Sequence, residues 1–410
     1  MSDPARLFLW SGLIWQGALR AYWVSLVVRI TVDLGLPSLQ LVLLGTAMEV
    51  AVLISEVPTG VVADTISRKW SVVIGFVAVG AAQIGAGLAE PFGLLVATQV
   101  LWGVAYTFRS GAETAWITDE LGGPEHVEQL LLRRARLQLV VSIFAIFAGA
   151  GLARLTSLAT SVVLSGVTLI VTGLVLAVTM PETAFSPPSA TGAVRSRLAV
   201  ALAAFRTTLL SGARAVRSSA SLRTLVTVLV LAGLAGEAVD RLDIRRLDDL
   251  GLSADLDEII VVGAIAAVES ALGALVLWWG QSRFTGARVA PGMGLLLVVS
   301  AFGIAALGLV AVLPVAIVGL VVQGGLRSAA QPLATTWTNA HAPSEVRATV
   351  HSFVEQANSV GEIGGGVLLG AVAAATTVPT AMSGSIVLIL AAAAVALGGR
   401  RTWTLQPATV

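Results

Sequence analysis

The chain consists largely of apolar stretches, each about as long as a helix that crosses a bilayer. A transmembrane helix needs about 20 mostly apolar residues. Hydrophobic residues make up 56% of the chain and charged residues 12%, whereas soluble domains have about 25% charged residues. Because this charge is too little to cover a water-facing exterior, the pattern predicts an all-α protein embedded in a membrane.

Twelve stretches of this length follow one another along the chain. The first is too long for the apolar core of a signal peptide and lacks a small-residue cleavage site after it, so we expect it to remain as a membrane helix. The predicted spans are residues 7–31, 38–63, 71–89, 92–118, 137–155, 159–180, 224–244, 256–280, 291–309, 312–338, 349–374 and 379–399.

Basic residues in the loops predict how the chain is threaded through the membrane. With a cytoplasmic N-terminus, 17 Lys and Arg residues fall on the cytoplasmic side, five on the outer side and three inside spans. Short cytoplasmic loops carry an excess of Lys and Arg. We therefore predict a multi-pass protein of the cell membrane with both termini in the cytoplasm.

A long polar segment divides the spans into two sets of six. It begins with PETAFSPPSATG at residue 181 and carries six Arg residues. We predict an N-terminal six-helix bundle over residues 1–180, a cytoplasmic linker over 181–223 and a C-terminal six-helix bundle over 224–410.

The two halves also resemble each other in sequence. FRSGAETAWITDE at 108–120 matches LRSAAQPLATTWTN at 326–339, which places Arg109 and Arg327 218 positions apart. A fainter match relates ADTISRK at 63–69 to SRFTGAR at 282–288, at an offset of 219. Two nearly equal offsets predict an internal repeat, as in many transporters.

The composition excludes several classes of function. The chain has no Cys and three His, so disulfides, thiolate chemistry and zinc sites are not expected, and we predict no cofactor. A net charge of +1 gives no reason to expect a nucleic-acid partner. No G-x-x-x-x-G-K-[ST], H-E-x-x-H or G-x-S-x-G motif is present. We therefore predict that the protein is not an enzyme.

One polar stretch carries a family resemblance. GVVADTISRK at 60–69 resembles the loop signature G-x-x-x-D-R-x-G-R-R between spans two and three of the major facilitator superfamily. Thr65 and Ser67 replace a basic residue and a glycine of that signature. The residues that match it are Gly60, Asp64, Arg68 and Lys69.

The resemblance implies twelve helices in two pseudo-symmetric bundles that work by alternating access. It also implies a conformational latch, in which Asp64 lies near the start of span eleven. There Arg347 and the positive end of a helix would attract it. For Arg68 and Lys69 the alternative is that they only set the membrane topology.

Other segments bear on the direction and energy source of transport. EVPTG at 56–60 is similar to a segment that precedes the loop signature in drug-efflux-like members of the superfamily. EAVDRL at 237–242 and RATVHSF at 347–353 resemble segments of a branch of bacterial permeases. Drug/proton antiporters usually carry an Arg where this chain has Gln99, and their G-P-x-x-G-G motif in span five is missing.

The EVPTG resemblance and the carboxylates within the spans predict proton-coupled export of amphiphilic small molecules, whereas Gln99 and the missing motif favour an importer or facilitator. The alternatives are an importer or facilitator of a small metabolite, and a non-transporting sensor or scaffold. The expected partners are a small-molecule substrate, protons and the lipid bilayer, and we expect a single chain to be the functional unit.

Charged residues inside the spans are candidates for proton or substrate binding, because burying one in a membrane costs about 2.5–3.5 kcal/mol on insertion scales. Spans three, six, nine and twelve contain none, and in the superfamily those four helices face lipid. The candidates are Arg20, Glu49, Arg109, Glu113, Glu237, Glu269, Arg327 and Glu362.

These charges allow more than one role. Glu49 and Glu269 are candidates for carrying a proton or for fixed ion pairs with Arg20 or Arg327. Arg109 and Glu113 are four residues apart, so a local pair is geometrically easy, and a gating network is favoured over substrate contact. Five tryptophans are expected either to stack on an aromatic substrate or to pack and anchor: Trp15, Trp23, Trp102, Trp116 and Trp337.

Overall fold

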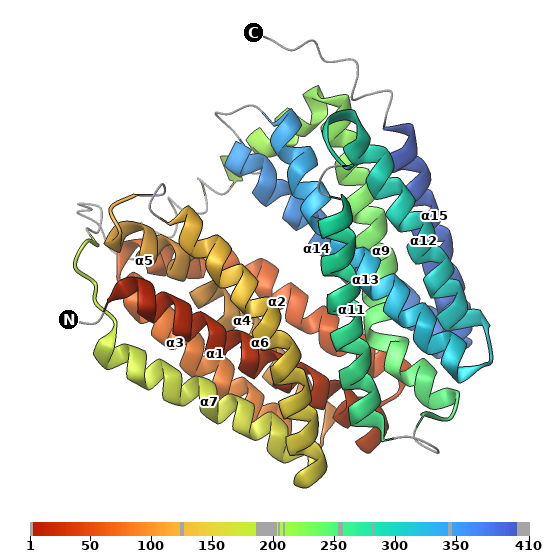
Figure 1. Ribbon diagram of the computed structural model, residues 1–410, viewed down its shortest axis with the longest axis horizontal. Coiled ribbons are helices and arrows are strands. Elements are labelled where there is room, and N and C mark those ends of the chain that lie inside the picture. The colour runs from red at the N-terminus through yellow and green to blue at the C-terminus, as the bar shows by residue number, and fades with distance from the viewer. Residues whose placement is uncertain are drawn as a thin grey trace. The chain divides into compact units, whose positions relative to one another are not determined.

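The computed structural model describes residues 3–123, 127–185, 203, 206–207, 210–252, 257–280, 283–342 and 347–399. Over these residues the protein is all-helical, with thirteen α-helices (Figure 1). They are α1 (Pro4–Val28), α2 (Ser38–Thr65), α3 (Arg68–Leu88), α4 (Phe92–Ser110), α5 (Ala112–Glu120), α6 (Glu128–Leu155), α7 (Leu158–Thr179), α9 (Ala220–Asp249), α11 (Glu258–Gly280), α12 (Val289–Leu309), α13 (Leu313–His341), α14 (Arg347–Ala375) and α15 (Val378–Gly398).

Each predicted span coincides with a helix, with one difference in the fourth. The stretch 92–118 is not one helix, because the chain breaks at Gly111 into α4 and α5. Ten of the described helices are long and apolar enough to cross a membrane, namely α2, α3, α6, α7, α9, α11, α12, α13, α14 and α15. Two predicted spans, α1 and α4, fall outside that set, and both carry polar residues such as Arg20 and Gln99 along an apolar sequence.

Hydroxyl side chains fix the starts of several helices. Ser67 accepts the backbone N–H of Trp70 at 3.0 Å and begins α3, and Ser157 begins α7 in the same way. Such caps satisfy amide groups that have no partner within the helix. They explain why these helices begin where the apolar stretches do.

The chain forms two compact units. The first comprises Met1–Gly35, Ala47–Phe205 and Glu258–Gly263. The second comprises Leu36–Thr46, Arg206–Asp257 and Ala264–Val410. Much of the predicted linker, and the chain end from residue 400, lie outside the described residues. The boundaries 1–180, 181–223 and 224–410 remain a prediction.

Close helix packing in the first unit depends on a pair of glycines. α3 lies against α7 and α4, and α1 lies against α6 and α7. A Cβ on Gly80 would lie 2.5 Å from the carbonyl oxygen of Gly166, and a Cβ on Gly166 would lie 2.4 Å from that of Gly80. The absence of both side chains lets the backbones of α3 and α7 meet, which is how small residues promote helix association in membranes.

The second unit repeats this device with different helices. α12 lies against α13 and α15, and α9 lies against α14 and α15. A Cβ on Gly303 of α12 would lie 2.7 Å from the carbonyl oxygen of Gly319 of α13, and the reverse distance is 2.5 Å. Both units therefore use glycines to bring two helix backbones into contact.

Candidate transport site and latch motif

The first unit contains a cavity of about 420 Å³ lined by residues of α1, α2 and α4. Two of the predicted charges, Arg20 and Glu49, line it together. Its other lining residues are Gln16, Leu19, Trp23, Met48, Val52, Trp102 and Tyr106. Two residues of opposite charge and three aromatic side chains therefore line the same cavity.

The aromatic wall is built by three rings. Trp102 and Tyr106 stack with an interplanar angle of 9° and ring centroids 5.2 Å apart. Trp23 meets Trp102 edge-on, with centroids 5.6 Å apart. Stacked and edge-on arrangements both suit the charge distribution of aromatic rings. Of the five tryptophans considered from the sequence, Trp23 and Trp102 lie at this cavity.

The other three tryptophans have structural contacts instead. Trp15 lies under the guanidinium of Arg109 at 4.1 Å. Trp116 donates its indole N–H to the carbonyl oxygen of Pro181 at 2.7 Å. Trp337 is fully buried and donates to the hydroxyl of Ser221 at 2.8 Å.

Gln99 has a defined partner in the first unit. Its side-chain amide donates to the hydroxyl of Tyr22 at 3.1 Å, which joins α4 to α1. Both side chains are buried. At the position where drug/proton antiporters usually carry an Arg, this chain therefore holds a neutral hydrogen bond.

The second unit contains its own cavity of about 280 Å³. Arg327 of α13 and Glu362 of α14 line it, and Asn358 donates to Glu362 at 3.0 Å. The remaining lining residues are Leu229, Ala232, Gly233, Met293, Leu297, Gly324, Ser328, Ala330 and Gln331. Of the other predicted charges in this unit, Glu269 places its carboxylate against the backbone of Gly324.

Arg327 forms an ion pair that was not predicted from the sequence. Its partner is Asp240 of α9, and its guanidinium also packs against Gly236, which has no side chain to obstruct it. The internal repeat aligns Arg327 with Arg109, but the residue four positions later is Gln331 instead of a glutamate. Asp240 follows Glu237 by three residues on one helix face, and that spacing was the available signal. Glu237 itself pairs with Arg241 at 2.8 Å.

Arg109 and Glu113 form an ion pair across the break at Gly111. A third residue, Arg134 of α6, donates to the same Glu113 oxygen at 2.9 Å. All three side chains are buried. Glu113 therefore joins α4, α5 and α6 by accepting two guanidinium groups.

Aromatic rings stabilise the two arginines of this triad. The Arg109 guanidinium lies 5.3 Å from the Phe76 ring in addition to its contact with Trp15. Arg134 lies 4.2 Å from the Phe8 ring. Ring faces attract cations, which offsets part of the cost of burying two positive charges beside one negative charge.

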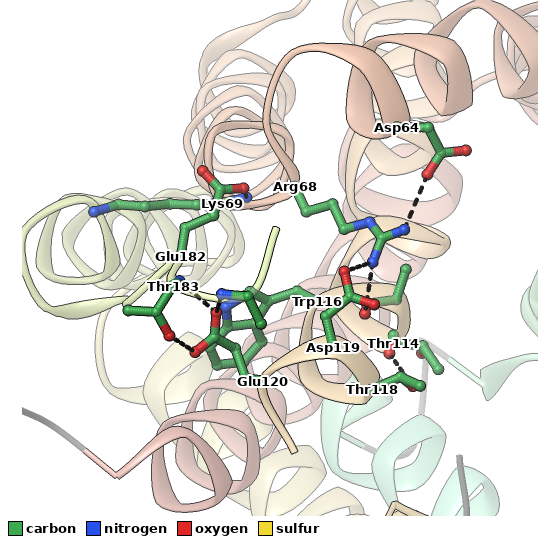
Figure 2. A network of polar contacts seen from close by, with 12 residues as sticks. Asp64, Arg68, Lys69, Thr114, Trp116, Thr118, Asp119, Glu120, Glu182 and Thr183 are labelled. Carbon is green, nitrogen blue, oxygen red and sulfur yellow. Dashed lines mark hydrogen bonds and ion pairs between the residues drawn. The ribbon is translucent and has the colours of Figure 1, made fainter. Parts of the chain in front are cut away.

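The motif between α2 and α3 forms a second polar network, which Figure 2 shows. Arg68 pairs with Asp119 of α5 and donates to the carbonyl oxygen of Ala115 at 3.0 Å. Asp64, one turn earlier, lies 3.6 Å from Arg68, and its side chain is 65% exposed. Arg68 therefore connects the loop to α5, and Asp64 is the weaker partner.

Residues 181–185 complete this network, a role that no pattern in the sequence predicted. The carboxylate of Glu182 accepts the Ser67 hydroxyl at 2.7 Å and the backbone N–H of Lys69 at 2.9 Å. A carboxylate at the start of α3 is favoured by the helix dipole. Lys69 therefore contributes its backbone to the contact.

Glu120 holds the same segment from α5. One carboxylate oxygen accepts the backbone N–H groups of Thr183 at 2.6 Å and Ala184 at 3.0 Å, and the other accepts the Thr183 hydroxyl at 2.7 Å (Figure 2). Partial burial would raise the pKa of Glu120, but these hydrogen bonds favour the ionised form. The result is a pKa below the usual value.

The predicted latch partner of Asp64 lies in the other unit. Arg347 is the first residue of α14 and is exposed. Gly60, in the last two turns of α2, has open space where a side chain would stand. The latch of Gly60, Asp64, Arg68, Lys69 and Arg347 remains a prediction. Among the described residues, no group of three or more acidic or histidine side chains could hold a metal ion.

The described residues form helices, ten of them candidate spans, and each unit has a cavity lined by charged residues, which is the character of a multi-pass membrane transporter. The family profile described as Major Facilitator Superfamily matches residues 9–366. The protein belongs to this superfamily, whose members are secondary transporters and not enzymes. A search of curated proteins returned no match.

Solved structures of the superfamily have the same fold. The crystal structure of nucleoside transporter NupG superposes with a TM-score of 0.74 at 14% identity, covering 99% of this chain and 100% of that one. A bacterial homolog of the human lysosomal transporter Spinster gives 0.74 at 18%, covering 98% of each chain. A point mutant of the peptide transporter POT gives 0.73 at 13%, covering 97% of this chain and 95% of that one. At these identities the likeness establishes the fold alone.

Proposed function

We propose that the protein exports amphiphilic small molecules across the cell membrane in exchange for protons. The observation that carries this proposal is the cavity of the first unit, where Arg20 and Glu49 lie with Trp23, Trp102 and Tyr106. Aromatic faces suit the apolar part of an amphiphile, and a few polar groups orient it.

The coupling requires a carboxylate that exchanges a proton. Three candidates lie within candidate spans: Glu49 at the first cavity, Glu362 at the second and Glu269 beside Gly324. Acidic residues within membrane spans are typical members of proton pathways in transporters. If a proton and a substrate compete for one such carboxylate, the carrier exchanges one for the other across the membrane.

Topology and gating belong to the same proposal. We place both termini in the cytoplasm of a bacterial cell, because the sequence divides its basic residues 17 to five between the two sides. The loop between α2 and α3 would then be cytoplasmic. Asp64 would alternate between Arg68 and the start of α14 as the two bundles change access, with a difference of a few kcal/mol at most.

Reconstitution in liposomes tests the transport proposal. The vesicles would carry an imposed proton gradient as the only energy source, and a panel of amphiphilic dyes and drugs would be measured. We expect gradient-driven accumulation of at least one compound. Glu49→Gln, Glu269→Gln and Glu362→Gln would be compared, and the residue that carries the proton is the one whose loss abolishes accumulation but spares downhill exchange.

Matched controls separate transport from folding. Glu90→Gln removes an exposed carboxylate between α3 and α4 and should transport normally. Trp278→Ala removes a tryptophan that is 68% exposed, whereas Trp23→Ala removes one that lines the cavity. Equal transport by both tryptophan variants would contradict a role for the aromatic wall.

A facilitator or importer of a small metabolite is the second candidate. It is favoured by the neutral Gln99–Tyr22 hydrogen bond, which occupies the position where drug/proton antiporters usually carry a basic residue. The NupG and POT structures are those of a nucleoside transporter and a peptide transporter. Saturable equilibration that ignores the gradient would establish this alternative, and no flux of any compound would favour a sensor or scaffold.

A further inference from the structure

We propose that the loop between α11 and α12 binds an anionic phospholipid. Arg283 holds the phosphate group, Arg288 adds a second positive charge at the same end of the helix pair, and a lipid chain lies along the ring of Trp279. The site is separate from the cavities of the two units and does not depend on which compound is transported.

The end of α11 has the character of a membrane interface. α11 is a candidate span of 23 residues, and its last turn carries two neighbouring tryptophans. Trp278 is 68% exposed and Trp279 is 49% exposed. Tryptophans concentrate where the headgroups of a bilayer meet its apolar core. The residues that directly follow α11 therefore lie at the depth of the lipid phosphates.

Phe284 gives the loop after α11 a defined shape. A Cβ on Gly280, the last residue of α11, would lie 2.6 Å from the Phe284 ring, and a Cβ on Gly292, in the first turn of α12, would overlap the same ring. The ring also meets Trp279 edge-on, with centroids 6.1 Å apart. Two glycines thus make room for one aromatic side chain that joins the ends of both helices.

Arg283, directly before Phe284, is exposed but held in place. Its guanidinium donates to the carbonyl oxygen of Trp279 at 2.7 Å and lies 4.2 Å from the centre of the Trp279 ring. Ring faces attract cations, and the hydrogen bond uses one of the five N–H groups of a guanidinium. A planar guanidinium with further donors is well suited to phosphate oxygens.

Neither Arg283 nor Arg288 has an acidic partner in the part of the chain that the structure describes. The sequence contains no Asp or Glu between Glu269 and Glu345, so α12 and α13 carry none, and α15 carries none either. Glu269 lies three turns before the end of α11, about 16 Å along the helix. The two positive charges are therefore not neutralised within their own helix pair.

The acidic residues of α9 lie at the other end of α12. They begin at Glu237, in the second half of α9. In that half, Arg246 donates to the carbonyl oxygen of Leu307 at 3.2 Å, and Leu307 is near the end of α12, whereas the loop with Arg283 precedes its start.

The internal repeat shows how this loop differs from its counterpart. At an offset of 219, Arg283 takes the position of Asp64. In the first unit the charges of the loop pair within the protein, because Arg68 contacts both Asp64 and Asp119. In the second unit an arginine replaces the acidic residue, so the loop has a surplus of positive charge that suits an anion from outside the chain.

The position of the loop identifies that anion as a lipid headgroup. Anionic lipids give membrane surfaces a negative potential that attracts Lys and Arg beside a span. Because the Arg283 guanidinium lies on the exposed Trp279 ring, one phospholipid can place its phosphate at the guanidinium and its chain on the ring. A dissolved anion would use only the first of these contacts.

Lipid binding to the full chain in detergent tests the proposal. Wild type would be titrated with dioctanoyl phosphatidylglycerol and with dioctanoyl phosphatidylcholine, and bound lipid would be measured by native mass spectrometry. We expect the anionic lipid to bind more tightly. Arg283→Gln should weaken its binding about fivefold, which corresponds to about 1 kcal/mol for one charge near an anionic surface, and should leave phosphatidylcholine unchanged.

Arg6→Gln is the matched control, because Arg6 is 87% exposed and already pairs with Asp3. It should change the binding of neither lipid. Equal binding of the two lipids by wild type, or equal effects of Arg283→Gln and Arg6→Gln, overturns the proposal. Displacement of the lipid by an equal concentration of inorganic phosphate would show a site for dissolved anions and would overturn it as well.

A second measurement uses wild type alone and so does not depend on the folding of a variant. Phosphatidylglycerol with a photoreactive group in its chain would be added to nanodiscs of phosphatidylcholine, and the labelled peptides would be mapped. We expect labelling of the peptide that contains Trp279, and less labelling there by photoreactive phosphatidylcholine. Equal labelling of this peptide by both lipids overturns the proposal.

Discussion

Thr183 donates both its backbone N–H and its hydroxyl to Glu120, at 2.6 and 2.7 Å, and so fastens the segment after α7 to the end of α5. The same segment reaches the start of α3 through Glu182 and Ser67. The first residues of the predicted linker are therefore held by the motif between α2 and α3.

The Glu120 contact should depend on pH in a defined direction. Since the pKa of Glu120 is lowered in the folded state, its contribution to stability is fully present above the ordinary value of 4.5. It is lost as the pH falls through the lowered pKa. We expect the amides of Thr183 and Ala184 to be protected from hydrogen exchange at pH 6 and to lose that protection as Glu120 is protonated.

Glu120→Gln provides the control for that measurement at constant pH. It keeps an acceptor but removes the charge, so exchange of these two amides should accelerate about fivefold at pH 6, in line with one weakened hydrogen bond. Amides in the middle of α7 should be unchanged. Identical exchange in wild type and variant would contradict a role for the charge.

Substitutions of Arg68 and Asp64 should affect different properties, the first the stability of the protein and the second its transport rate. Arg68→Lys keeps the positive charge but loses the planar donors that reach Asp119 and Ala115 together, so we expect it to lower the free energy of unfolding by about 1 kcal/mol. Asp64→Asn should change stability by less than about 0.5 kcal/mol, because its pair with Arg68 is long and exposed. Thermal unfolding in detergent measures both.

If the proposed latch exists, Asp64→Asn will still alter the transport rate in liposomes while leaving stability unchanged. A variant with wild-type transport and wild-type stability would remove Asp64 from the mechanism.

Glu113 should be the most sensitive acidic residue of the first unit. Glu113→Gln leaves Arg109 and Arg134 buried without a counter-charge, and breaking such a pair costs about 3–5 kcal/mol. We expect a large fall in the thermal midpoint. Arg134→Met in the Glu113→Gln background should recover part of it, because it removes one uncompensated charge. An unchanged midpoint in Glu113→Gln would show that the triad adds little to stability.

The glycine contact between α3 and α7 should tolerate no side chain. Gly80→Leu would push its side chain into the backbone of Gly166 and separate the helices, whereas Gly93→Ala has open space around its new Cβ. We expect Gly80→Leu to prevent a monodisperse elution profile and Gly93→Ala to behave as wild type. Normal folding of Gly80→Leu would mean that the two helices can pack at a larger distance.

Asp240 should matter for transport more than another acidic residue of the same helix. Asp240→Asn removes the partner of Arg327 beside the second cavity, whereas Asp249→Asn removes the partner of Arg245, nine residues further along α9. We expect a loss of transport of up to about fivefold in the first and little change in the second, because Arg327 lines the second cavity and its partly exposed pair with Asp240 contributes at most about 1 kcal/mol. Equal activities would place Asp240 outside the transport mechanism.

The sequence by itself determined the helices and much of their boundaries. Apolar runs of membrane length fix where helices form, since every backbone polar group in lipid must be satisfied within the segment. The four-residue spacing of Arg109 and Glu113 indicated a local ion pair, because residues four apart are neighbours on the surface of a helix. The motif at Gly60–Lys69 and the profile match at residues 9–366 gave the superfamily.

Only the tertiary structure decided which distant side chains meet. The pairing of Arg327 with Asp240, the contact of Glu182 with the start of α3 and the arrangement of Trp23 against Trp102 each depend on which helices are neighbours and how they are rotated. Glycine contacts such as Gly80–Gly166 set those neighbours by excluded volume. No local spacing in the chain encodes that geometry, so the sequence named charged candidates but not the cavities or which of the charges line each one.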